Sequence, residues 1–347
     1  MISLLLKLLS FTIFIFAQIA YAAPMAPFEV IKGDEAVKFI GNSGVVIGPV
    51  KIAVIANWLE IDNKASVIKQ INPKAEIIEI HFEDQGGFAS HIKALSAIGY
   101  GITSGAKIIL TSIDALNALS MSLEAYRQFM DYTKKHNILM VVGAGDNDLN
   151  NDSFGFYPTN VWEDNLLSVC SVGFPTLLNQ INYIKNSFSQ KHQIFNYQQL
   201  MRFYQFQQLE VAIADNQPLT DKQKFFIANA IRNGMQIQEG EWIKSYFSNF
   251  GIRKVHVCAP GEQVYYFSEA FDSGTEASAA VVAGAASIML GVNPHLKPFQ
   301  IRNIFIQTSS KSKKLKFTSR SGGVLNLFEA VKKLLLPLSE QIRSMFE

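Results

Sequence analysis

Carboxylates gather in one short, Asn-rich stretch of this sequence. Asp146, Asp148 and Asp152 lie within the nine residues GDNDLNNDS. Oxygen ligands at such spacing suit a hard cation, so a structural Ca²⁺ site is one hypothesis. An ordinary polar turn is the preferred interpretation, and we expect neither a metal ion nor another cofactor.

The two cysteines, Cys170 and Cys258, are a second candidate for chemistry. In an exported protein an even number of cysteines permits a disulfide, and two buried free thiols would explain them equally well. The sequence leaves both interpretations open.

The elements that must position these residues alternate along the chain. Short apolar runs predict buried strands, and between them two stretches, 91–104 and 122–136, have a helical pattern. The predicted strands are Lys51–Ile55, Glu76–Ile80, Lys107–Leu110, Ile138–Val142 and Leu166–Val172. Strands of this length separated by helices are typical of βαβ units, so the pattern predicts an α/β fold with a mostly parallel sheet.

Two later segments complete the plan. Residues 174–244 are rich in Gln, Phe and Tyr, and the capping box Thr220–Gln223 indicates a helical insertion. Its aromatic residues, among them Phe195 and Tyr197, are explained equally well by a small core and by partner binding. Residues 275–290 form an Ala-rich helix of small side chains, which can pack close to a sheet.

The N-terminus reads as an export signal. Residues 1–22 contain one Lys, an apolar stretch and a final Ala-Tyr-Ala, which predicts a signal peptide cleaved after Ala22. The mature chain is then expected to be periplasmic or extracellular, without a membrane contact. A net charge of +2 does not favour a nucleic-acid surface, and the basic run Lys311–Lys316 is interpreted as a solvated loop rather than a patch for an acidic partner.

Four segments, in order, resemble the subtilisin-like serine peptidases. Gly274–Gly284 (GTEASAAVVAG) is similar to the family's nucleophile motif GTSMASPHVAG. Tyr246–Gly251 together with Val257–Gly261 (VCAPG) resembles its FSNYG and VAAPG segments, and Ser321–Val331 resembles its closing segment. Residues 157–173 are similar to its YPA and DNVISVGA motifs. The resemblance implies a three-layer α/β/α domain over 51–335, preceded by a lead-in at 23–50 and followed by a tail at 336–347.

The same resemblance places the catalytic positions, and all four are substituted. Glu276 stands at the serine, Phe88 at the histidine, Ala56 at the triad aspartate and Asp146 at the oxyanion asparagine. A serine peptidase needs a hydroxyl, a proton acceptor, a carboxylate that orients it and oxyanion donors. We therefore expect no catalytic residues, and we expect Glu276 to act as a helix cap or a salt-bridge partner.

Other residues could replace the lost ones. Ser278 lies two residues beyond the nucleophile position, so its side chain should point away from the site, and His91 matches a structural histidine of the family. Asp146 and Glu276 could form a carboxylate pair with one raised pKa. The related sedolisin group uses an aspartate at the oxyanion position but retains the serine that is absent here. Two solvated or capping carboxylates are the preferred interpretation.

The resemblance leads to two hypotheses of function. The first is an exported pseudoprotease that binds a peptide or protein partner without cleaving it, through strand pairing with two segments of the family's substrate groove. These segments are Ser112, Ile113 and Asp114 after the third strand, and Gly143, Ala144 and Gly145 of the edge strand. The second hypothesis is an active serine endopeptidase with rearranged catalytic residues, which requires a nucleophile that the sequence does not reveal.

Overall fold

The computed structural model describes residues 27–82, 87–112, 115–116, 123–161, 163–173, 242–262, 264–265 and 271–336. The chain divides into two compact units, one of residues 1–23 and 173–246 and the other of residues 24–172 and 247–347. The predicted signal peptide, the insertion up to Glu241 and the tail beyond Leu336 lie outside the described residues. In the smaller unit the described part contains one short strand, β8 (Ile243–Lys244).

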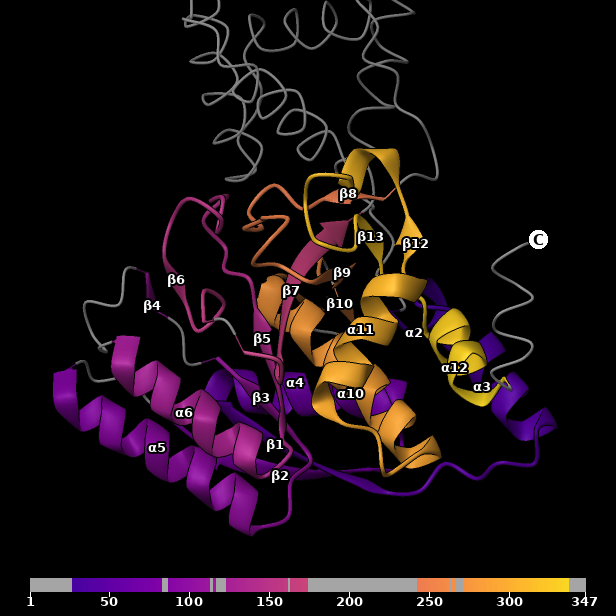
Figure 1. Cartoon of the computed structure of the whole chain (residues 1–347), viewed down its shortest axis with the longest axis horizontal. Coiled ribbons are helices and arrows are strands. Elements are labelled where there is room, and N and C mark those ends of the chain that lie inside the picture. Colours follow the sequence, from indigo (N-terminus) through magenta and orange to yellow (C-terminus); the bar gives the residue numbers. More distant parts are fainter. Residues whose placement is uncertain are drawn as a thin grey trace, which may run out of the picture. The chain divides into compact units, whose positions relative to one another are not determined.

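A sheet with the strand order β12-β13-β9-β7-β5-β3-β1-β2 organises the larger unit (Figure 1). The strands are β1 (Val50–Ala56), β2 (Ala75–His81), β3 (Ile108–Thr111), β5 (Leu139–Gly143), β7 (Leu166–Gly173), β9 (Val257–Pro260), β12 (Ser310–Lys311) and β13 (Gly323–Val324). Neighbours pair in parallel from β2 to β13, and only the β12–β13 pair of this path is antiparallel. The predicted strands and the mostly parallel sheet are confirmed.

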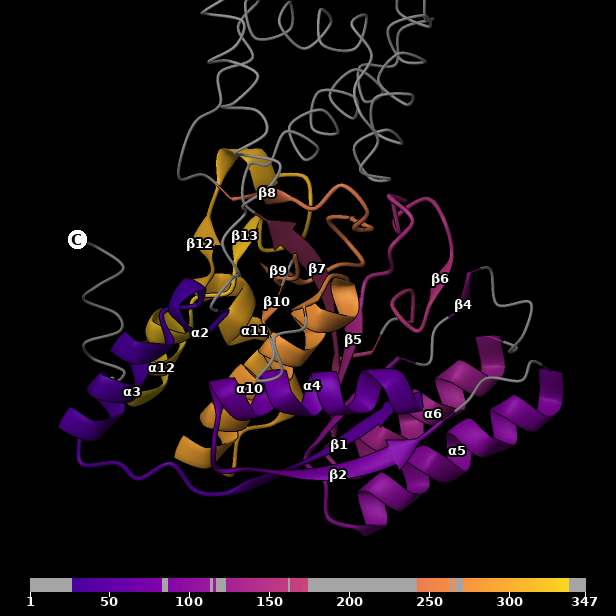
Figure 2. The ribbon, with the colours of Figure 1, turned by 180° about the vertical axis from the view of Figure 1, so that it is seen from behind.

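Helices cover both faces of the sheet, which gives the three layers that the resemblance implies. On one face α5 (Gly87–Thr103) and α6 (Leu123–Lys135) lie side by side in both views (Figures 1 and 2). On the other face lie α4 (Trp58–Ile71), α10 (Thr275–Val292), α11 (Pro298–Thr308) and α12 (Leu327–Leu335). Strand β1 alternates between the two cores: Ile52, Val54 and Ala56 face α10, whereas Ala53 and Ile55 face α5.

The sequence pattern did not predict helix α4. Its Ile61, Val67, Ile68 and Ile71 join the core, but Lys64 on the same helix is also buried. A lysine among the core positions obscures the apolar period by which an amphipathic helix is recognised. α4 packs against α10, and Gly284 allows the close approach because a Cβ there would lie 2.7 Å from Cβ of Ile71.

Helix α10 is the central helix of its layer. Nearly all of its residues are buried, since small side chains let the helix pack against α4, β5, β9 and β1. Among the described residues it is the only helix long and apolar enough to cross a membrane, and 89% of its apolar window is buried inside the protein. Its apolar character is therefore that of a core helix.

The lead-in is part of the domain. Residues 27–42 form α2 (Pro27–Val30) and α3 (Gly33–Asn42), and α3 packs against α12. Ile31, Ala36 and Ile40 are buried in the core, and the amide of Leu327 donates to the carbonyl of Ile31 at 2.7 Å. The described part of the lead-in therefore contributes to the core of the larger unit.

Short elements complete the larger unit. They are the antiparallel pairs β4 (Ala115–Leu116) with β6 (Phe156–Tyr157) and β10 (Val264–Tyr265) with β11 (Phe271–Asp272), and the 3-10 turn η1 (Lys313–Leu315).

Candidate functional site

Glu276 lies in the first turn of α10, at the carboxyl edge of the sheet. Its Oε2 atom accepts a 2.7 Å hydrogen bond from Oγ of Ser112, the residue that follows β3. The same oxygen lies 3.5 Å from Nζ of Lys64 on α4. The nucleophile position of the family resemblance therefore carries a carboxylate that is bonded to two other elements.

Lys64 connects this carboxylate to a second one. Its side chain is 1% exposed, and its ammonium group also forms an ion pair and hydrogen bond with Oε2 of Glu60, one turn earlier on α4. Asn57 fixes Glu60 in turn: Nδ2 of Asn57 donates to Oε1 of Glu60 at 2.9 Å, and the amide of Glu60 donates to Oδ1 of Asn57 at 3.0 Å. The sequence analysis did not identify Lys64, Glu60 or Asn57 as site residues. The only signal in the sequence was the pair Glu60 and Lys64, an acidic and a basic residue four positions apart, shortly after β1.

The pKa of Glu60 is lowered by this network. Burial acts to raise the pKa of the carboxyl, but the charge and hydrogen bond of Lys64, with further hydrogen bonds from Asn57 and Ser112, outweigh it. A carboxylate with a lowered pKa is a weak proton acceptor, so Glu60 suits a structural ion pair better than a general base.

The described contacts show which helix lies next to Glu276. Helix α5, which carries the predicted Phe88 and also His91, packs with α6 on the face opposite to α10. Helix α4, in contrast, packs against α10, and its first turn follows Ala56 at the end of β1 with only Asn57 between them. We therefore assign the position next to Glu276 to α4, where Glu60 and Lys64 stand. Ala56, which the resemblance places at the aspartate position, is buried at the end of β1 and has no polar side chain.

Asp146 binds the start of α10. Its Oδ1 accepts a 2.8 Å hydrogen bond from the amide of Thr275, and Oγ1 of Thr275 accepts one from the amide of Gly145 at 3.0 Å. Asp146 thus caps the helix that carries Glu276, while Glu276 bonds to Ser112 and Lys64. Asp146 contacts Thr275, whereas Glu276 contacts Ser112 and Lys64, and a capping role for Asp146 is the one that these contacts support.

The predicted edge strand has its main chain already engaged. The amide of Ala144 donates to the carbonyl of Val169 at 2.8 Å, and the amide of Gly145 is held by Thr275. The carbonyl of Gly143 accepts from Oγ1 of Thr159 at 3.1 Å. The carbonyls of Ala144 and Gly145 accept from Asn151 and Asn249. We therefore place no strand pairing with a peptide at these residues. Of the other predicted segment, Ser112 is described, whereas Ile113 and Asp114 lie outside the described residues.

Ser278 does not replace the missing nucleophile. It is fully buried, and its Oγ atom donates to the carbonyls of Ala259 and Gly274 at 3.1 and 3.4 Å. The contact with Ala259 on β9 confirms the prediction that its side chain points away from the site.

In the acidic stretch 146–152, Asp146 and Asp152 both accept hydrogen bonds from backbone amides elsewhere in the chain. Asp152 accepts hydrogen bonds from the amides of Arg253 and Lys254 at 3.0 Å each, in a different loop from the one that Asp146 binds. In the part of the chain that the structure describes, no three His, Cys, Asp or Glu side chains are grouped so that they could hold a metal ion. The contacts of Asp146 and Asp152 support the polar-turn interpretation.

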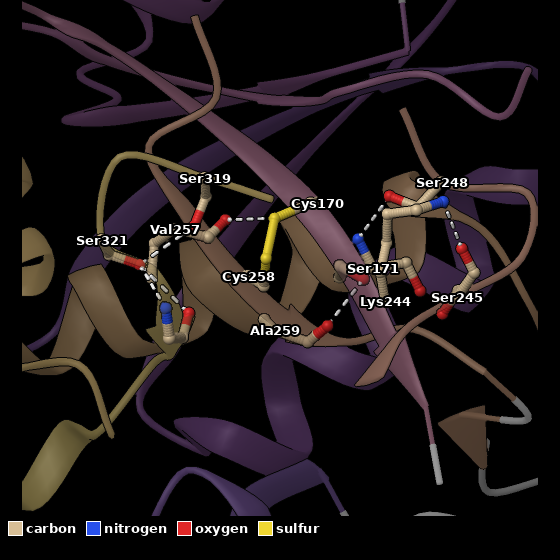
Figure 3. Close-up of a disulfide and its surroundings, with 12 residues drawn as sticks. Cys170, Ser171, Lys244, Ser245, Ser248, Val257, Cys258, Ala259, Ser319 and Ser321 are labelled. Atoms are coloured by element: carbon tan, nitrogen blue, oxygen red, sulfur yellow. Dashed lines mark hydrogen bonds between the residues drawn. A yellow bond between two sulfur atoms is a disulfide. The ribbon is translucent and has the colours of Figure 1, made fainter. Parts of the chain in front are cut away.

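The two cysteines form a disulfide in the middle of the sheet (Figure 3). Cys170 on β7 and Cys258 on β9 are direct partners in the parallel register, with a Cα–Cα distance of 4.4 Å. Both residues are fully buried. This outcome decides between the two alternatives that the sequence left open.

Comparison with known proteins agrees with this fold. The model of the subtilase family (peptidase S8) matches residues 54–324. Subtilisin-like protease 3 of Plasmodium falciparum (isolate 3D7) is 29% identical over 107 residues, which are 30% of this chain and only 14% of that protein.

Solved structures are similar over most of the chain. A structure of MycP1, a serine protease of the type VII (ESX-1) secretion system, has a TM-score of 0.57 at 14% identity and covers 90% of this chain and 89% of its own. A lanthipeptide protease has a TM-score of 0.54 at 15% identity and covers 87% and 93%. At these identities the likeness shows the fold alone. The family match, which extends over most of the sequence, confirms the resemblance seen in the motifs: the chain belongs to the subtilase family.

Proposed function

We propose that this subtilase is an exported protein that binds a peptide or protein partner and does not cleave peptide bonds. The observation that carries the proposal is the position of Glu276. Where the family motif has a serine, this chain has a carboxylate that accepts from Ser112 and pairs with the buried Lys64. An acyl transfer at this position would need a hydroxyl nucleophile and a proton acceptor beside it, whereas position 276 itself carries a carboxylate that is paired with Lys64.

Two observations support export. The N-terminal 22 residues have the composition of a signal peptide. The Cys170–Cys258 disulfide is of a kind that forms and persists in oxidising compartments outside the cytosol. Detection of the chain in periplasmic or culture fractions, with Ala23 as its first residue, would test this part of the proposal.

A second candidate function rests on Ser112. Its hydroxyl donates to Oε2 of Glu276 at 2.7 Å, so a serine and a carboxylate that could take its proton are in contact. In an active enzyme Ser112 would be the rearranged nucleophile. The ion pair with Lys64 stabilises the ionised carboxylate and weakens it as a base, which favours the non-catalytic proposal.

A fluorophosphonate probe separates the two functions, because it labels an activated serine without requiring a particular substrate. The intact protein should show no mass adduct, whereas an active subtilisin in the same experiment is labelled. An adduct that disappears in the Ser112→Ala variant would establish the second candidate and overturn the first. A Glu276→Ser variant is also expected to remain unlabelled, since its neighbours Glu60 and Lys64 are held in their own ion pair.

A further inference from the structure

Three loops of the larger unit are joined by main-chain hydrogen bonds into one surface. The amide of Asn151 donates to the carbonyl of Phe250 at 2.7 Å, and the amide of Gly251 donates to the carbonyl of Thr318 at 2.9 Å. The amide of Arg320 then donates to the carbonyl of Val255 at 2.7 Å. Residues 150–154, 251–254 and 316–320 are therefore neighbours, although they are far apart in the sequence.

Each of these loops exposes one large apolar side chain. Phe154 is 53% exposed, Ile252 is 47% exposed and Phe317 is 58% exposed. Single exposed apolar residues are common on protein surfaces, but a group of three on adjoining loops is typical of an interaction site. We call the surface formed by these three loops the three-loop patch.

The three-loop patch is predominantly basic. Its loops contain Arg253, Lys254, Lys316 and Arg320, and Asp152 is their only acidic residue. The carboxylate of Asp152 is largely buried and accepts from the amides of Arg253 and Lys254. Nε of Arg253 lies 3.9 Å from Oδ2 of Asp152, and the Arg253 side chain is 63% exposed. The ammonium group of Lys316 lies 5.3 Å from the centre of the Phe317 ring, so a cation and an aromatic ring are presented together.

We infer that the three-loop patch is the docking surface for an acidic protein segment that carries apolar side chains. The inference rests on the proposed function, for which it supplies the partner's chemistry. Apolar side chains of the partner would cover Phe154, Ile252 and Phe317, and its carboxylates would meet Arg253, Lys316 and Arg320. The three loops are fixed by their mutual hydrogen bonds, so binding requires little ordering of the chain. The three apolar side chains are each about half covered, which suits contact with a protein better than insertion into a bilayer.

The test uses the protein purified after export and a short fluorescein-labelled peptide in which Glu alternates with Phe and Leu. A second peptide with Lys in place of Glu is the comparison. Fluorescence anisotropy should show binding of the Glu peptide, weaker binding at high salt, and no binding of the Lys peptide. The double variant Ile252→Ser, Phe317→Ser should weaken binding tenfold or more, because central apolar contacts dominate such interfaces. Arg253→Gln with Arg320→Gln should reduce both the affinity and its dependence on salt.

A matched control lies on another face. Tyr100 of α5 is 60% exposed, and Tyr100→Ser should leave binding of the Glu peptide unchanged. The urea midpoint of each variant confirms that it is folded, which is expected because the substituted side chains are exposed. Equal binding of both peptides, or no loss in the patch variants, would overturn the inference. Binding to phosphatidylglycerol vesicles but not to the Glu peptide would also overturn it and assign the patch to a membrane surface. None of these outcomes alters the fluorophosphonate result, so failure of the docking surface and failure of the proposed function are distinguishable.

Discussion

The ammonium group of Lys64 lies between the carboxylates of Glu276 and Glu60, with its Nζ atom 3.5 Å from Oε2 of Glu276. An ion pair thus connects α4 to α10 at the position where the family motif has its nucleophile. Lys64 is 1% exposed, whereas Glu276 is 21% and Glu60 is 39% exposed, so the lysine depends on its partners far more than they depend on it.

The first prediction follows from this asymmetry. Glu276→Gln should lower the free energy of unfolding by about 1–2 kcal/mol, because Lys64 keeps Glu60 as a partner. Glu60→Gln combined with Glu276→Gln should cost about 3 kcal/mol or more, exceeding the sum of the single changes, because the buried ammonium group then has neither carboxylate. Adding Lys64→Met to the double variant should recover most of the loss. Urea unfolding curves give the four values, and strictly additive single changes would contradict the shared role of Lys64.

The second prediction concerns acid. His256 is buried before β9, where its Nδ1 accepts from the amide of Ser168. Burial, and then the charges of Arg302, Arg320 and Lys254, lower its pKa to about 3. Between pH 6.5 and 3 the unfolded chain therefore binds a proton that the folded protein does not, and the free energy of unfolding should fall as the pH is lowered through this window, approaching about 1.4 kcal/mol per pH unit.

The quantity to measure for His256 is the change in the free energy of unfolding with pH. A loss of packing in a variant shifts this free energy equally at every pH and leaves the slope unchanged. Urea unfolding between pH 6.5 and 5 precedes the titration of most carboxyls in the unfolded chain. The variant His256→Gln, whose side-chain oxygen can accept from the amide of Ser168, should have a flatter dependence over this range. The same slope in the variant and the native protein would show that another group is responsible.

The third prediction concerns the disulfide. Replacing Cys170 and Cys258 together by Ala should lower the free energy of unfolding by about 2–5 kcal/mol, because the bond closes a long loop in the unfolded chain. Both sulfurs are buried, so dithiothreitol with iodoacetamide should alkylate the folded protein only when urea is added. Rapid alkylation of the native protein in buffer would contradict the buried position.

The fourth prediction uses two glycines with opposite surroundings. A Cβ at Gly143 would lie 2.7 Å from Oγ1 of Thr275 and 3.1 Å from the amide nitrogen of Glu276, so Gly143→Ala should destabilise the protein by about 1–3 kcal/mol. A Cβ at Gly41, in the last turn of α3, would have no atom within 4 Å, so Gly41→Ala should be neutral or stabilise by about 0.5–1 kcal/mol. Thermal unfolding of the two variants compares them directly. A stabilised Gly143→Ala would show that β5 and α10 can separate at no cost.

The strands and the position of Glu276 could be predicted because their signals are local. Apolar runs such as Ile138–Val142 are too short for a typical helix and favour buried strands. The GTEASAAVVAG segment places Glu276 by its unbroken match to the family motif. The position next to Glu276 could not be predicted, because it depends on which helix reaches the same face of the sheet. The sequence from Gly87 has the better motif, but α5 lies across the sheet from α10, and the contact with α10 is made by α4.

The network around Lys64 was unpredictable for a related reason. A lysine in a helix is ordinarily a surface residue, and only tertiary contacts show that Lys64 is enclosed. The packing of the lead-in could not be predicted either. Its core residues Ile31, Ala36 and Ile40 are buried because α12, from the far end of the chain, packs against α3.

The Cys170–Cys258 bond also encloses the whole 174–244 insertion in a covalent ring, since both cysteines lie outside its ends. A single proteolytic cut anywhere between them leaves two polypeptides that remain one molecule until the bond is reduced. The ring can also grow or shrink at small entropic cost, because loop closure depends only logarithmically on length. The enclosed segment can therefore change in length, or be nicked, while β7 and β9 keep their register.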